Sequence, residues 1–81
     1  MTNNQHRKTV AAEVRAALAR DGRSAAALAG ATGISKTSLS RKLRGQTPLY
    51  VEEIVLIAHT LGIDAGSLLA PAMSDHGTNA A

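Results

Sequence analysis

The sequence contains no cysteine, which excludes a disulfide scaffold, a thiolate metal site and a cysteine nucleophile. This absence also fits a reducing compartment such as the cytosol. The only aromatic residue is Tyr50, so a surface that stacks successive bases on aromatic rings is nearly excluded. No apolar run approaches the roughly 20 residues of a membrane span, and the polar start MTNNQHRKTV lacks the apolar segment of a signal peptide. We therefore expect a cytoplasmic chain without a membrane partner.

The histidines, which are the commonest acid-base residues, show no catalytic pattern. His6, His59 and His76 form no HxxxH or HExxH motif. The one adjacent carboxylate, Asp75 beside His76, lies in a segment without periodicity that cannot hold a catalytic geometry. No glycine-rich phosphate loop is present either. We expect no enzymatic activity, no metal, no cofactor and no small-molecule substrate.

Charges are distributed unevenly along the chain, whose formal net charge is +3. Residues 1–49 contain all nine lysines and arginines and only two acids, which gives a charge of +7. Residues 50–81 contain four acids and no lysine or arginine, which gives −4. Such an asymmetry is typical of an electropositive face that binds a polyanion, and it is equally compatible with a dipolar surface that maintains solubility.

Hydrophobic periodicity predicts one small all-α domain in these 81 residues. Val10, Val14 and Leu18 recur at helical spacing after Thr9, which is suited to cap a helix. Glycine residues separate four further helical segments, and Ser35 is suited to cap the one that begins at residue 36. The expected helices cover residues 9–20, 25–31, 36–44, 51–61 and about 65–70. We expect a flexible basic arm over residues 1–8, the folded domain over 9–70 and a disordered tail over 71–81.

The segment GISKTSLSRKLRG, residues 33–45, has three cations within four residues, 41–44, preceded by hydroxylated residues. On a helical wheel of about 100° per residue, Leu39 and Leu43 fall on one side. Thr37, Arg41 and Arg44 fall opposite them, within about 60° of one another. A purely solvated helix would usually mix in acids for i,i+4 pairs, but no acid occurs between residues 21 and 52. The pattern therefore predicts two buried leucines and an outer face suited to phosphate.

This predicted helix follows another short one across a turn that contains Gly33. That order is typical of a helix-turn-helix, whose second helix enters the major groove of DNA. Ala29 stands where the two helices would touch, and Leu39 stands in the core. Residues 9–70 resemble the Xre/Cro family, the lambda-repressor-like helix-turn-helix domains of phage and bacterial regulators. The segments that carry the resemblance are SAAALAGATGISKTSLSRKLRG, TPLYVEEIVLIAHTLGID and GSLL.

The resemblance implies a compact five-helix fold, operator DNA as the ligand and a dimer without enzymatic activity. It implies base contacts by the outward residues early and midway along the second helix of the motif, namely Lys36, Thr37, Ser38 and Arg41. It also implies phosphate contacts near the end of that helix and in the next loop, by Arg44, Gln46 and Thr47. Two positions depart from the family pattern. Ala25 replaces a common polar phosphate contact, with Arg23 or Ser24 as substitutes, and Thr32 replaces an apolar residue and predicts a looser turn.

Each assigned role has an alternative. Arg41 can bind guanine O6 and N7 as a fork, worth about 1–3 kcal/mol of discrimination, or it can contact phosphate or solvent. Lys42 and Arg44 are predicted to bind phosphate, which positions a protein on DNA without specifying a sequence. Ser40 flanks the outer face of the same helix, where it either contacts phosphate or is simply a polar surface residue. Arg23 contacts the DNA backbone or is a surface charge near Asp21.

These patterns predict a sequence-specific regulator of double-stranded DNA, a small phage or bacterial repressor. Arg7 and Lys8 either form an arm around the duplex or belong to a disordered basic terminus. Any dimer must use the apolar-rich second half of the domain, whose alanine-rich surfaces predict a weak contact formed mainly on DNA. The alternative function is a protein-interaction module of the same fold, an antitoxin or anti-regulator, that binds its partner through the acidic second half.

Overall fold

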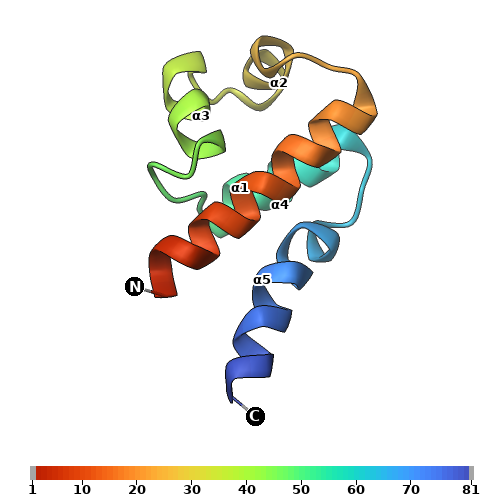
Figure 1. The fold of residues 1–81 in the computed structure, drawn as a ribbon. Coiled ribbons are helices and arrows are strands. Elements are labelled where there is room, and N and C mark those ends of the chain that lie inside the picture. The colour runs from red at the N-terminus through yellow and green to blue at the C-terminus, as the bar shows by residue number, and fades with distance from the viewer. Residues whose placement is uncertain (1, 81) are drawn as a thin grey trace.

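The computed structural model describes residues 2–80, with side chains for residues 5–73. Within residues 2–80 the chain forms five helices and no strand, which confirms the predicted all-α fold. The helices are α1 (Thr2–Asp21), α2 (Ala25–Thr32), α3 (Lys36–Leu43), α4 (Val51–Leu61) and α5 (Ala65–Ala80). In Figure 1, α1 crosses in front of α4, with α2 and α3 on one side of this pair and α5 on the other side.

The core consists of small and branched aliphatic side chains from all five helices. α1 packs against α3, α4 and α5, and α4 packs against α2 and α5. The largest fully buried side chains in the described part of the chain are Val14, Leu28, Leu39, Ile57 and Leu68. Because each helix contributes to this one core, burial of apolar surface fixes the position of α2 and α3 relative to the other helices. No helix among the described residues has the length and apolar character of a bilayer-spanning segment.

The first helix begins earlier than the sequence predicts. α1 starts at Thr2, whereas Thr9 was the expected cap and residues 1–8 the expected flexible arm. The Thr9 hydroxyl instead donates to the Gln5 carbonyl within the helix, at 2.9 Å. Tertiary contacts favour this extension, because the Arg7 guanidinium donates to the Gln46 carbonyl at 3.4 Å. The described part of the predicted arm is therefore an extra two turns of α1, packed beside the loop that follows α3.

The last helix continues beyond its predicted end. α5 passes through Pro71 and reaches Ala80, where the sequence predicts a disordered tail over 71–81. A proline inside a helix removes one backbone hydrogen bond. The burial of Ala72, which joins the hydrophobic core, favours continuation of the helix past this proline. Residue 81, the end of the predicted tail, lies outside the described residues.

A tight turn places α3 against α2. Gly33 adopts a left-handed conformation with φ of 79°, and its N–H donates to the Ala29 carbonyl at 2.9 Å. Thr32 was expected to loosen this turn. Its hydroxyl instead donates to the Leu28 carbonyl at 2.9 Å and accepts from the Ile34 N–H at 3.4 Å, so its polar atoms are satisfied within the turn.

Candidate nucleic-acid interface

The geometry of α3 follows from a cap at its start and two leucines beneath it. Ser35 is the N-cap residue, and its hydroxyl accepts the Ser38 N–H at 3.1 Å. Leu39 is fully buried and Leu43 nearly so, as the helical wheel predicts. The Arg15 guanidinium of α1 donates to the Leu43 carbonyl at the other end. These contacts anchor α3 at both ends and leave one long face exposed to solvent.

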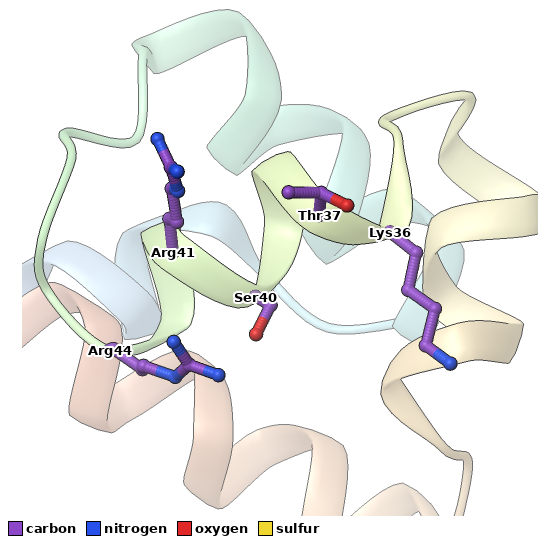
Figure 2. Close-up of a pocket in the computed structure, with 5 residues that line it drawn as sticks. All are labelled: Lys36, Thr37, Ser40, Arg41 and Arg44. Atoms are coloured by element: carbon purple, nitrogen blue, oxygen red, sulfur yellow. The ribbon is translucent and has the colours of Figure 1, made fainter.

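The exposed face of α3 brings five of the predicted contact residues together. One open pocket on this face is lined by Lys36, Thr37, Ser40, Arg41 and Arg44, and we call these five residues the α3 face. Figure 2 shows their side chains projecting from α3 and its C-terminal end around this hollow. Lys36, Thr37, Arg41 and Arg44 are exposed, and Ser40 is half-buried. Three cations and two hydroxyls thus surround a surface whose lining contains no acid.

Ser38 lies to one side of the α3 face. Its side chain is half-buried, and it does not line the pocket formed by the other predicted contact residues of α3. Its backbone N–H is engaged with the Ser35 cap. The structure therefore separates Ser38 from Lys36, Thr37 and Arg41, the other residues predicted to contact bases.

Lys42 occupies a different position from the one predicted for it. Only 6% of the residue is exposed, and its ammonium bonds to the Glu53 carboxylate at 3.1 Å and to the Pro48 carbonyl at 3.2 Å. The helical wheel places Lys42 beside the leucines, about 100° from Arg41. Its ammonium points toward α4 because partners are available there. This corrects the expectation that Lys42 joins Arg44 in binding phosphate.

The start of α2 is the second place where phosphate contacts were predicted. Ser24 is exposed and caps α2 by accepting the Ala27 N–H at 3.1 Å, which leaves its own O–H free to donate. Arg23 forms an ion pair with Asp21 at 3.0 Å and donates to the Thr60 carbonyl at 3.4 Å. The geometry of Arg23 matches the alternative of a paired surface charge, whereas Ser24 is available to a phosphate.

The loop between α3 and α4 carries the last predicted contacts. Gln46 is exposed and Thr47 is half-buried. Gly45 is buried with φ of 79°, and a Cβ added there would lie 3.1 Å from Lys8 Cγ. Lys8 itself is exposed. The predicted arm residues Arg7 and Lys8 thus lie on a helix beside this loop. Any contact of Lys8 with DNA would come from this helix and not from a flexible arm.

No pattern in the sequence predicts a role for Arg15, whose guanidinium donates to the Leu43 carbonyl at the end of α3. Basic side chains near a helix C-terminus favourably meet its last carbonyls. The residue is on α1 and the carbonyl on α3, so only the tertiary fold pairs them. Among the described residues, no group of three potential ligands could hold a metal ion.

Two comparisons place this geometry among known proteins. The family model described as a helix-turn-helix domain matches residues 9–71. The crystal structure of the clp gene regulator ClgR from Corynebacterium glutamicum is similar with a TM-score of 0.78 and 27% sequence identity. That similarity covers 91% of this chain and 79% of the ClgR chain. A search of curated proteins finds no match.

Proposed function

Since the chain belongs to the helix-turn-helix domain family of DNA-binding regulators, we propose that it is a sequence-specific repressor that binds operator DNA in the cytoplasm of a bacterium or a phage-infected cell. The α3 face carries this proposal, because it exposes three cations and a threonine together without an acid. α3 lies in the major groove, and occupancy of a promoter prevents transcription. The proposal assigns the chain no catalytic step.

Within the α3 face the proposed roles differ by position. Lys36, Thr37 and Arg41 contact base edges, with Ser38 as a peripheral contact. Arg44 directly follows α3 and, with Ser40, contacts phosphate. Backbone contacts outside the face come from Ser24, Gln46, Thr47 and Lys8. Phosphate contacts supply affinity and fix the register, whereas base contacts supply specificity.

Salt dependence tests whether phosphates are neutralised at all. Each neutralised phosphate contributes about −0.9 to the slope of log affinity against log salt concentration. If Lys8 and Arg44, the two cations assigned to the DNA backbone, each neutralise one phosphate, affinity for a duplex should fall about 12-fold between 50 and 200 mM salt. Fluorescence anisotropy with a labelled random-sequence duplex measures this change without knowledge of the operator. An affinity that changes less than about twofold would instead favour a protein-interaction module of the same fold.

We further propose that two copies associate through the outer face of α4. Val51 and Val55 are 69% and 52% exposed, one turn apart on this helix, and Leu56 is 39% exposed beside them. A symmetric dimer through this face would present two copies of α3 to half-sites about 34–36 Å apart or a multiple of that distance. The exposed area is small, so the dimer is weak and forms mainly on DNA.

Val55→Asp should abolish this association, because the dimer would bury the new carboxylate without a partner. Analytical ultracentrifugation on DNA with two half-sites should show two copies of the unaltered protein bound per duplex and one copy of the variant. Ala19→Asp is the matched control, since it adds the same charge to an exposed position of α1. Two bound copies of the Val55 variant would exclude α4 as the dimer surface.

A further inference from the structure

Lys42 is the one buried charged side chain in the described part of the chain. Arg41, directly before it, and Arg44, two positions after it, are both exposed on the α3 face. A buried ammonium is costly unless it is paired and hydrogen-bonded. The buried ammonium of Lys42 therefore needs a role that an apolar side chain could not fulfil.

The partners of Lys42 come from two elements beyond α3. Its ammonium bonds to the Pro48 carbonyl at 3.2 Å and to the Glu53 carboxylate at 3.1 Å, and it lies 4.8 Å from the ring centroid of Tyr50. The same Glu53 oxygen also accepts the Tyr50 backbone N–H at 2.9 Å. We call Lys42, Glu53 and the two loop groups that they bind the Lys42–Glu53 clamp. It joins α3, the loop after α3 and the first turn of α4.

The clamp adds directional polar bonds to the apolar contacts that hold α3. Leu39 and Leu43 hold α3 against the core through apolar burial, which is non-directional. Hydrogen bonds and ion pairs require defined distances and angles. Lys42 lies beside the leucines on the helical wheel, so its bonds oppose rotation of α3 about its own axis. Such a rotation would move the guanidinium of Arg41 away from the base edges that it is proposed to contact.

The clamp also places charge favourably for a polyanion. Glu53 lies at the start of α4, directly after the loop that carries Gln46 and Thr47. An unpaired carboxylate there would repel phosphate at short range. Its bond to Lys42 neutralises that charge inside the protein, while the exposed cations of the α3 face remain free.

We propose that Lys42 and Glu53 are positioning residues for DNA recognition, which fix the rotation of α3 and the path of the loop that follows it. This inference rests on the proposed DNA-binding function. Replacement of a buried ion pair by apolar or neutral groups of similar size often leaves stability unchanged. Orientation of the α3 face is therefore the property that depends on the pair.

The test is the double variant Lys42→Met/Glu53→Gln, which keeps the side-chain volumes and removes both charges. We expect a nearly unchanged urea midpoint, faster amide hydrogen exchange in residues 45–50, and about tenfold weaker binding to the preferred duplex, with a smaller loss for unrelated duplexes. The slope of log affinity against log salt should stay the same, because no phosphate contact is lost. Glu52→Gln is the control, since Glu52 is an exposed carboxylate of the same helical turn. It should leave amide exchange unchanged and should not weaken binding.

Several results would overturn the inference. A salt slope shallower by about 0.9 would show that Lys42 contacts phosphate directly, as the comparison variant Arg44→Ala should show for an exposed cation. Unchanged affinity and unchanged amide exchange would show that the clamp positions nothing. If the unaltered protein fails to bind DNA, the proposed function fails. The amide exchange of residues 45–50 then still decides whether the pair orders the loop.

Discussion

Replacing Leu39 with alanine is expected to lower the free energy of unfolding by about 2–5 kcal/mol. Leu39 is fully buried beneath the α3 face and packs in the single core to which all five helices contribute. The substitution removes apolar contacts and leaves a cavity that the surrounding helices fill only in part. A domain of this size has a total stability of about 4–12 kcal/mol, so the loss would consume a large share of it.

Urea unfolding followed by circular dichroism measures this loss, and the control is Leu56→Ala. Leu56 is 39% exposed on the outer face of α4, so the same chemical change there should cost less than about 1 kcal/mol. Equal losses for the two variants would contradict the assignment of Leu39 to the core. A destabilised Leu39 variant should also bind DNA more weakly at temperatures where it is partly unfolded.

Arg41→Ala should remove base discrimination at one position of the bound sequence, at a cost of about 1–3 kcal/mol for the preferred sequence. Arg41 is exposed on the α3 face, where its guanidinium can form two parallel bonds to one guanine. Affinity for unrelated duplexes should change much less than affinity for the preferred one. Competition binding with single-base variants of a selected duplex measures both quantities.

Arg44→Ala is the matched comparison for Arg41, because it removes the same side chain from the same face. It should weaken binding to all sequences alike and make the salt slope shallower by about 0.9. If the two arginine variants lose affinity equally and without regard to sequence, Arg41 contributes no base contact. The two roles are thus distinguished by specificity and by salt dependence, independently of the size of either loss.

The helix-turn-helix could be predicted from the sequence because its signals are local. Gly33 permits the left-handed turn, Ser35 caps α3, and the spacing of Leu39 and Leu43 determines which face is buried. All three features appear in the structure as predicted. The resemblance to the Xre/Cro family is confirmed by the helix-turn-helix domain match over residues 9–71 and by the likeness to ClgR.

The features that escaped prediction depend on contacts between distant residues. Arg7 and Lys8 are helical beside a loop almost 40 positions away, which no local pattern indicates. The charge of Lys42 predicts an exposed side chain. The carboxylate of Glu53, 11 positions later, supplies a partner that allows the ammonium to be buried. Continuation of α5 past Pro71 likewise accompanies the burial of Ala72 in the core. In each case tertiary packing overrides a residue's ordinary preference.

Selection of bound sequences from a pool of random duplex DNA tests the central claim, that the α3 face reads bases, most directly. We expect a single short motif to be enriched, in inverted pairs whose centres lie about 10–10.5 base pairs or a multiple apart. The same selection with Arg41→Ala should lose the preference at one position of that motif. A pool that is retained by the protein but stays random in sequence would show that α3 contacts only the backbone, and it would contradict base recognition by this face.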